Sequence, residues 1–243
     1  MLRDGGEPPG GALATGPIRI VFFDLGGTLL DFRDPIAWSE VAREVGYPEE
    51  PEHLAHAVAE VERRADRLDR FGPSEFWRQV LQVASGREVP LPDGERFLSR
   101  WVDRPRPGRV FSDVDRCLAE LRADHRRLGV ISNSRSIDAV RRRLDEAGLA
   151  GVFDPIVSSG TEGVEKPDRR IFTRAVELAG VRPSEAFHVG DLPVTDAEGA
   201  AAAGLHAVWL HRDGTGTDGP VAEITSLSEL PAVVRDIRAR PVK

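Results

Sequence analysis

Cysteine and long apolar runs are nearly absent from this chain of 243 residues, and each absence excludes a class of protein. Cys117 is the only cysteine, so no disulfide can form within the chain and a reducing compartment suits it best. No apolar run approaches the roughly 20 residues that a transmembrane helix needs, and the first residues lack the apolar segment of a secretory signal. The formal net charge of −7 disfavours nucleic acid and anionic membranes as partners. We therefore expect a cytoplasmic protein that binds neither nucleic acid nor membrane.

Lysine is also scarce, which gives weight to each lysine that is present. Lysine and arginine total 33, yet the only lysines are Lys166 and the last residue, Lys243. An ammonium is a compact point charge and a guanidinium is a broad planar fork, so the two are not interchangeable. An ordinary surface lysine is the alternative at position 166, but in a chain that otherwise uses arginine we predict a functional one. The run from Arg141 to Arg143 lies among acidic residues and predicts a solvated helix face.

Five short apolar segments predict buried strands, and helical patterns separate the later ones. The first is Ile18 to Phe23 (IRIVFF), a β-branched and aromatic run with one charge, as in a parallel sheet covered on both faces. The other four strand segments are Leu128 to Ile131, Phe153 to Val157, Ala186 to Val189 and Ala207 to Leu210. Helical spacing before Gly148 and before Gly180 supplies connecting helices. This alternation predicts an α/β fold with a doubly wound, parallel, Rossmann-like sheet.

The rest of the chain predicts a tail and an insertion. Residues 1–16 are rich in glycine and proline and indicate a disordered N-terminal tail. Residues 33–107 lack convincing strands and carry charged helix formers (VAEVERRADRLDR), so we expect an inserted all-helical cap domain. Residues 17–32 and 108–243 then form the Rossmann-like core. The core closes with a flexible connector (DGTGTDGP) and a helix from Ser226 to about residue 238.

Three of the predicted strands end directly in polar groups that can do chemistry. The first strand runs into Asp24, the second into Ser132 and Asn133, and the fourth into Gly190 and Asp191. Sites in open parallel sheets form just beyond the carboxyl ends of the strands. Each residue alone has a plainer explanation as a helix cap or a turn residue. Their coincidence at three strand ends predicts a site.

Four segments of the sequence resemble the motifs of the haloacid dehalogenase superfamily of phosphatases. These segments are DLGGTL at 24–29, ISNS at 131–134, EKPDRRIF at 165–172 and GDLPVTDAEGAAAAG at 190–204. They follow the superfamily's order, with a helical cap inserted after the first, as in the subfamily with that cap position. The strings WRQVLQV and FHVGD further resemble the REG-2-like hydrolases. The resemblance implies a hydrolase that acts on a small phosphorylated metabolite and depends on Mg²⁺.

The resemblance also implies roles for the residues at the strand ends. Asp24 is the implied nucleophile, which attacks phosphorus and forms an aspartyl-phosphate that water then hydrolyses. Asp191 and the second oxygen of Asp24 are implied ligands of Mg²⁺, together with the backbone carbonyl of Gly26. Asp196 binds the ion through water or holds Asp191 in place.

Further residues are implied to bind the phosphate. Ser132 donates its hydroxyl, and the backbone N–H of Asn133 adds a donor at the N-terminus of a helix. Lys166 contacts both Asp24 and the phosphate. Asp31 matches a position that is often acidic in the family, and we expect it to cap the first helix of the insertion.

Gly26 departs from the family pattern, because the family's phosphatases carry a second aspartate two residues after the nucleophile. That aspartate protonates the leaving group and activates water, and such assistance is worth about 10²–10⁴-fold in rate. We favour a working, slower phosphohydrolase, in which a substrate group, a water on the metal or a cap side chain replaces the acid, or the leaving group needs none. The alternatives are a phosphometabolite-binding protein without turnover and a 2-haloacid dehalogenase, which needs no metal. His53 and His56 of the cap have no spacing that singles them out, and we expect them to face solvent.

Overall fold

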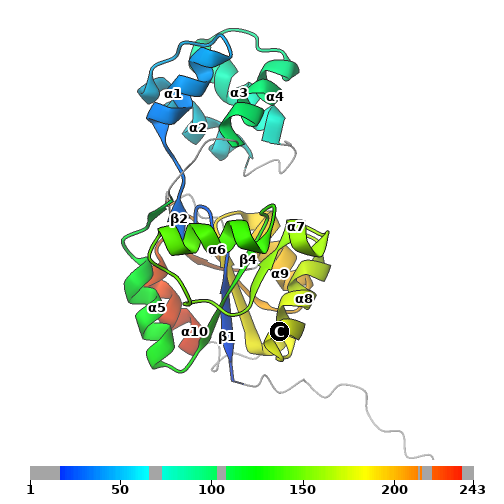
Figure 1. Cartoon of the computed structure of the whole chain (residues 1–243). Helices are drawn as coiled ribbons and strands as arrows, with labels where there is room; N and C mark the ends of the chain where they lie inside the picture. The colour runs from blue at the N-terminus through cyan, green and yellow to red at the C-terminus, as the bar shows by residue number, and fades with distance from the viewer. Residues whose placement is uncertain (1–16, 66–72, 103–107, 213, 215–220, 237–243) are drawn as a thin grey trace, which may run out of the picture.

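The computed structural model describes residues 17–65, 73–102, 108–212, 214 and 221–236 (Figure 1). The predicted tail, 1–16, and all of the predicted connector except Gly214 lie outside the described residues. A sheet flanked by helices forms the larger part of the molecule, and a group of helices lies beyond one end of the sheet (Figure 1). No helix in the described ranges is long and apolar enough to cross a membrane.

Six parallel strands form the sheet, in the order β5-β4-β1-β6-β7-β8. The strands are β1 (Ile20–Phe23), β4 (Arg127–Ser132), β5 (Ile156–Ser158), β6 (Ala186–Gly190), β7 (His206–Leu210) and β8 (Ala222–Ile224). Five of them overlap the predicted segments, and the predicted doubly wound, Rossmann-like α/β fold is confirmed. β5 begins at Ile156, later than predicted, although the N–H of Asp154 already donates to the carbonyl of Leu128 in β4 at 2.7 Å. β8 was not predicted, since three residues carry too weak a pattern.

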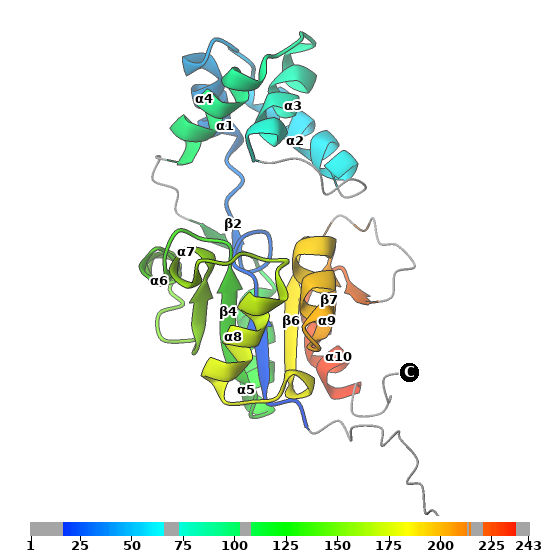
Figure 2. The same ribbon diagram turned by 90° about the vertical axis from the view of Figure 1, so that its right-hand side faces the viewer.

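The strands alternate their side chains between two hydrophobic layers. The helices of the core are α5 (Val114–Ala123), α6 (Ile137–Glu146), α7 (Ser159–Glu162), α8 (Arg169–Ala179), α9 (Gly199–Ala202) and α10 (Leu230–Asp236), with short turns η1 (Pro183–Glu185), η2 (Pro193–Glu198) and η3 (Leu227–Glu229). Val21 and Phe23 lie in one layer, which also contains side chains of α5, α6 and α10. Ile20 and Phe22 lie in the other layer, with side chains of α8 and α9. Helices on both faces (Figure 2) explain why β1 is apolar throughout.

Local signals set the ends of these helices. Ser136 caps α6 by accepting a backbone N–H three residues on, and Gly180, with φ of 63°, ends α8. The predicted closing helix consists of η3 and α10, and its predicted end near residue 238 lies outside the described residues. Cys117 of α5 is buried, which raises the pKa of its thiol to about 12. It is a core residue and not a nucleophile.

The predicted all-helical cap is present between two short strands. β2 (Leu30–Asp31) and β3 (Arg109–Val110) pair antiparallel where the chain leaves the core and returns to it. Between them lie α1 (Pro35–Glu44), α2 (Pro51–Ala65), α3 (Pro73–Ser85) and α4 (Leu91–Val102). The four helices have a hydrophobic core of their own, in which Trp77 stacks on Phe97 with 4.3 Å between ring centroids. Figure 1 shows the cap beyond the carboxyl end of β1, and its predicted limits, 33 and 107, stay predictions.

Asp34 caps the first helix of the cap, and Asp31 does not. Oδ1 of Asp34 accepts a backbone N–H three residues on at 3.0 Å, and Pro35 occupies the first helical position. Asp31 lies in β2, where its carboxylate accepts from Arg33 at 2.9 Å and from Arg109 at 3.3 Å. The predicted capping role of Asp31 is therefore wrong, because the helix begins four residues after it.

Candidate active site

Polar groups at three strand ends lie together, because their strands are neighbours. The sheet order places β1 between β4 and β6, so Asp24, Ser132 and Asp191 stand at the same edge of the sheet. With Lys166 they line one cavity of about 270 Å³. The hydroxyl of Ser132 lies 2.9 Å from that of Ser134. The cap of α6 is Ser136, so Ser132 does not have that role. The chain thus brings together the residues that the strand-end pattern selected.

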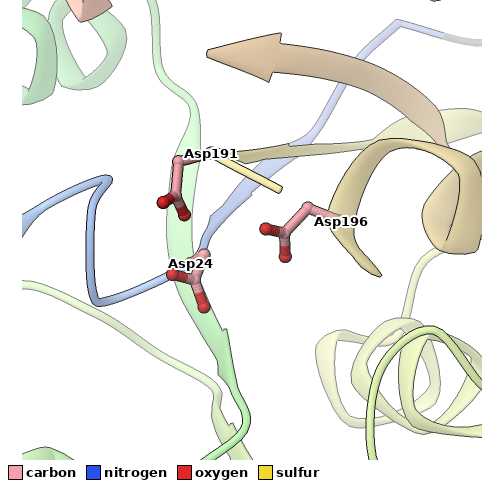
Figure 3. A group of neighbouring side chains, drawn as sticks. All are labelled: Asp24, Asp191 and Asp196. Carbon is pink, nitrogen blue, oxygen red and sulfur yellow. The ribbon is translucent and has the colours of Figure 1, made fainter. Parts of the chain in front are cut away.

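Three carboxylates meet in this cavity. One oxygen each of Asp24, Asp191 and Asp196 lies within 4.8 Å of the others, and Figure 3 shows the three side chains around a common space. Asp196 reaches it from the π-helical turn η2, where its Oδ2 accepts the N–H of Leu192 at 3.1 Å. Gly190 makes room for this turn, since a Cβ at that position would lie 2.2 Å from Cγ of Asp196.

Lys166 is buried among the carboxylates, and Asn133 holds it there. Nζ of Lys166 donates to Oδ1 of Asp24 at 2.5 Å and to Oδ1 of Asp196 at 2.6 Å. The side-chain amide of Asn133 accepts the N–H of Lys166 at 2.8 Å and donates to its carbonyl at 3.0 Å. The prediction that the N–H of Asn133 lies at a helix N-terminus is wrong, because α6 begins only at Ile137. The side chain of Asn133 therefore has a positioning role that the motif alone did not reveal.

Burial and mutual repulsion set the protonation of these groups. Burial raises the pKa of Asp24 to about 6, and the attraction of Lys166 opposes this shift only in part. Burial, and then the charge of Asp24, raises the pKa of Asp191 well above its ordinary value. Burial also acts to raise the pKa of Asp196, but Lys166 and His188 outweigh it and lower that pKa. For Asp24 and Asp191 the charge of Lys166 thus does not offset burial and mutual repulsion, and the pKa of both carboxyls stays raised.

The donor set fits a divalent cation with a preference for oxygen. Lys166 donates to Asp24 and Asp196 and not to Asp191, so the charge of Asp191 is the least compensated. Carboxylate and carbonyl oxygens are the ligands that Mg²⁺ takes in proteins, usually with several waters. Asp24 and Asp191 are therefore suitable ligands, with Asp196 close enough to contact the ion or one of its waters. Gly26 lines the same cavity, and the role of its carbonyl as a ligand stays a prediction.

His188 belongs to the site and was not predicted. It lies in β6 with its Nε2 3.1 Å from Oδ1 of Asp196, the oxygen that also accepts from Lys166. Burial lowers the pKa of His188, so the ring is neutral and holds the carboxylate as a hydrogen-bond donor. A polar residue inside the otherwise apolar string FHVG was the signal that could have found it.

Arg143 also lines the cavity, from α6. Its guanidinium carbon lies 5.1 Å from the ring centroid of Phe32, and burial, reinforced by Arg142, lowers the pKa of Arg143. Among the residues that the structure describes, no ion pair or hydrogen bond engages this guanidinium. Arg141 and Arg142 are exposed as predicted, but the solvated-face prediction is wrong for Arg143. The signal was its position three residues after Val140, which puts it beside the buried stripe of α6.

Position 26 has room for a side chain, although it carries none. A Cβ added to Gly26 would lie 3.4 Å from Cδ2 of Phe32, which is an ordinary contact. Gly27 differs, because it has φ of 71° and a Cβ there would lie 2.0 Å from Oδ2 of Asp191. The structure therefore requires glycine at position 27 and not at position 26.

A model of the haloacid dehalogenase-like hydrolases matches residues 18–204, which include all four motifs. The chain belongs to the haloacid dehalogenase-like hydrolases. The predicted family is thus confirmed, and the chain is a hydrolase of that family with its expected cap. The narrower resemblance to the REG-2-like hydrolases stays a prediction.

Relatives and solved structures resemble this haloacid dehalogenase-like hydrolase over most of its length. It is 29% identical to the N-acylneuraminate-9-phosphatase of Rattus norvegicus, over 90% of this chain and 95% of that protein. It is 31% identical to the human haloacid dehalogenase-like hydrolase domain-containing protein 3, over 78% of this chain and 80% of that protein. The crystal structure of a 2-haloacid dehalogenase from Pseudomonas syringae pv. tomato is 31% identical, with a TM-score of 0.56 over 90% of this chain and 99% of that chain.

Proposed function

We propose that this hydrolase is a cytoplasmic, Mg²⁺-dependent phosphatase that acts on a small phosphorylated metabolite through an aspartyl-phosphate on Asp24. The observation that carries the proposal is the meeting of three carboxylates, at Asp24, Asp191 and Asp196, within 4.8 Å. Phosphoryl transfer brings a dianion to a carboxylate and therefore calls for a cation, whereas halide displacement by an aspartate does not. The similarity to a protein named as a phosphatase also supports phosphoryl transfer over halide displacement.

The metal site and the residues beside it together compensate the negative charge of the phosphoryl group. Asp24, Asp191 and the carbonyl of Gly26 would hold Mg²⁺, which would supply positive charge near the phosphoryl oxygens. Lys166 fixes one oxygen of Asp24 and reduces the repulsion between that carboxylate and the phosphate. Ser132 donates its hydroxyl to a phosphoryl oxygen, assisted by the backbone N–H of Asn133.

Arg143 adds a second cation that the family motifs do not include. Lys166 is already shared by two carboxylates, so its charge is largely used within the protein. The guanidinium of Arg143 lines the same cavity and has no carboxylate partner among the described residues. It is therefore suited to a charge-assisted hydrogen bond with a phosphoryl oxygen.

The reaction proceeds in two displacements at phosphorus. A carboxylate oxygen of Asp24 forms a bond to phosphorus while the bond to the leaving oxygen breaks, and the leaving oxygen takes a proton. Water then attacks the aspartyl-phosphate, which restores Asp24 and releases inorganic phosphate. Since position 26 has no carboxyl, the first proton comes from water or from the substrate, and good leaving groups react fastest. His53 and His56 are exposed, so they do not replace the missing acid.

Halide displacement is the second candidate function. The 31% identity to a 2-haloacid dehalogenase and the missing carboxyl at position 26 both favour it. Asp191 and Asp196 weigh against it, because a cluster of carboxylates repels a carboxylate substrate and contributes nothing to loss of a halide. A phosphometabolite-binding protein without turnover would have the same cavity. Measured phosphate release therefore distinguishes the proposed phosphatase from that alternative.

Phosphate release from a panel of phosphorylated metabolites, with an aryl phosphate as a generic substrate, tests the proposal. The comparison is wild type with Mg²⁺, wild type with a chelator, and Asp24→Asn with Mg²⁺. Asp138→Asn is the matched control, since Asp138 is 93% exposed on α6. We expect release from wild type and from the control only with Mg²⁺, and none from Asp24→Asn. Chloride release from 2-chloropropionate without Mg²⁺, or no Asp24-dependent phosphate release from any compound, would overturn it.

A further inference from the structure

A second cavity adjoins the catalytic one, and all four tryptophans of the chain line it. Its volume is about 390 Å³, and it shares Gly26, Phe32, Asp191 and Leu192 with the cavity at Asp24. The chain has four tryptophans, and each is among the lining residues: Trp38, Trp77, Trp101 and Trp209. A volume at the lower end of the range for ligand sites fits one small metabolite.

The tryptophans reach this cavity from both parts of the molecule. Trp38, Trp77 and Trp101 come from α1, α3 and α4 of the cap, and Trp209 comes from β7 of the core. Nε1 of Trp209 donates to the backbone oxygen of Asp191 at 3.0 Å, so this wall is tied to the metal site. The cavity thus lies where the leaving group of a substrate must extend when its phosphate is at Asp24.

Apart from Asp191, which this cavity shares with the catalytic one, its charged lining residues are paired within the protein. Arg33 donates to Asp31 at 2.9 Å, and Arg212 donates to Asp113 at 2.9 Å. The guanidinium of Arg212 also lies over the ring of Phe111, 3.8 Å from its centroid. The walls therefore present aromatic surface and neutralised ion pairs, which favour an uncharged group over an anion.

Two polar atoms on residues that line the cavity are buried and have no hydrogen-bond partner among the described residues. They are Nε1 of Trp38, a donor, and Nδ1 of His211. Nε2 of His211 lies 3.5 Å from a carboxylate oxygen of Glu223, which favours the proton on Nε2 and leaves Nδ1 as an acceptor. A group that enters between cap and core and carries hydroxyls offers an acceptor to Trp38 and a donor to His211.

We propose that this cavity takes the leaving group of the substrate and that the leaving group is an uncharged ring bearing oxygen substituents. Flat indole surfaces bind the face of a ring, and the two unpartnered atoms bind its oxygens. A cyclic sugar and a nucleoside both have this chemistry, so the substrate is a phosphate ester of one of them. The inference rests on the proposed phosphatase function and gives the substrate class of that site.

Matched pairs of substrates test the ring directly. Glucose 6-phosphate and sorbitol 6-phosphate carry phosphate on the same carbon of a cyclic hexose and of the open-chain hexitol derived from it, and adenosine 5′-monophosphate supplies the nucleoside arm. We expect kcat/KM for the better cyclic compound to exceed that for sorbitol 6-phosphate by about tenfold. If kcat/KM for sorbitol 6-phosphate equals that for both cyclic compounds, the proposal is overturned.

Trp38→Phe keeps an aromatic ring and removes the unpartnered donor, so it tests the assignment of this wall. Tyr47→Phe is the matched control, because it removes one hydroxyl, bonded to Asp93 at 2.6 Å, elsewhere in the same cap. We expect Trp38→Phe to reduce the preference for the cyclic substrate by about threefold to tenfold through a higher KM, with no change in Tyr47→Phe. An unchanged preference in Trp38→Phe contradicts the assignment, and thermal melts of both variants verify folding.

Intrinsic fluorescence separates a failure of this inference from a failure of the proposed function. Since every tryptophan lines the cavity, a ring that enters it changes the fluorescence of Asp24→Asn protein, which binds without turnover. We expect a saturable change with the cyclic phosphates at lower concentration than with sorbitol 6-phosphate. The same change in a protein that releases no phosphate would retain the cavity assignment and reject the phosphatase. Phosphate release together with equal fluorescence responses to cyclic and open-chain compounds would retain the phosphatase and reject the cavity assignment.

Discussion

Nζ of Lys166 lies 2.5 Å from Oδ1 of Asp24, across 142 positions of sequence. The same ammonium lies 2.6 Å from Oδ1 of Asp196, and the lysine side chain is 2% exposed. Burial alone would lower the pKa of Lys166, but the charges of Asp196 and Asp24 outweigh it and raise that pKa. A compact, permanently charged donor thus stands between two carboxylates at the wall of the cavity, with its own side chain almost fully buried. This contact explains why the chain has a lysine here although it uses arginine nearly everywhere else.

Lys166→Arg is expected to lose about 10²-fold or more in kcat/KM although it keeps the charge. A guanidinium is broader than an ammonium, so it displaces Asp24 or Asp196. A displacement of the nucleophile by about 1 Å is enough to lower the rate substantially. Steady-state kinetics with an aryl phosphate measures the loss. Arg141→Lys, an exchange at a side chain that is 63% exposed, is the control and should be neutral. Wild-type kinetics in Lys166→Arg would mean that only the charge is required.

Arg143→Gln is expected to raise KM and to weaken inhibition by inorganic phosphate by about tenfold or more. The reason is that Arg143 lines the cavity at Asp24 with no carboxylate partner among the described residues. Arg142→Gln makes the same change in net charge at the preceding residue, which is exposed, and should have little effect. Inhibition constants of the two variants make the comparison. Equal effects in both would point to a long-range field and against a contact.

Gly26→Asp is expected to increase turnover of substrates with poor leaving groups by at least about tenfold, and of aryl phosphates by less. The added carboxyl supplies the missing proton donor, and the nearest atom to its Cβ, on Phe32, lies at 3.4 Å, so the backbone does not have to move. Gly26→Asn has the same shape without a titrating group and is the control. Rates for an alkyl phosphate and an aryl phosphate give the ratio. The same gain in Gly26→Asn, or no gain in either variant, contradicts the account.

Asp113→Asn is expected to lower stability near neutral pH and to have little effect in acid. The carboxylate of Asp113 accepts from Arg212, Ser226 and Leu227; burial raises its pKa, but these donors outweigh that and lower it. A carboxylate with a depressed pKa stabilises the fold above its unfolded pKa of about 3.9, and the effect is lost as the pH falls through the folded pKa.

Urea unfolding of wild type and Asp113→Asn at a series of pH values measures this difference. We expect the variant to be less stable by about 1–3 kcal/mol near neutral pH, since several donors lose a charged acceptor. The gap should close below about pH 4. Asp138→Asn, at an exposed site, should follow wild type throughout. A gap that persists or widens in acid contradicts the assignment.

Much of the fold and the polar cluster could be predicted because the signals are local. β1, β4 and β6 each have an apolar run followed by a polar residue, and adjacency in the sheet then brings Asp24, Ser132 and Asp191 together. The scarcity of lysine identified Lys166 before any geometry was known.

The parts that sequence did not predict depend on contacts between distant residues or on small differences in a local pattern. Asn133 binds the backbone of Lys166 across 33 positions, which no pattern within a motif reveals. Arg143 differs from Arg141 and Arg142 only in its direction around α6. Asp34, followed by Pro35 at the first helical position, caps α1, and the acidic residue at Asp31 is three positions too early for this role.

Acid trapping of the intermediate shows whether Asp24 carries the phosphoryl group during turnover. Wild type is mixed with an aryl phosphate and Mg²⁺, quenched in acid, digested and analysed by mass spectrometry. Since Gly26 supplies no base to activate water, breakdown of the intermediate is slow and the account predicts a phosphoryl group on the peptide that contains Asp24. The signal should be absent with a chelator and in Asp24→Asn. Steady release of phosphate with no phosphoryl group on that peptide, or with one on another residue, would contradict the account.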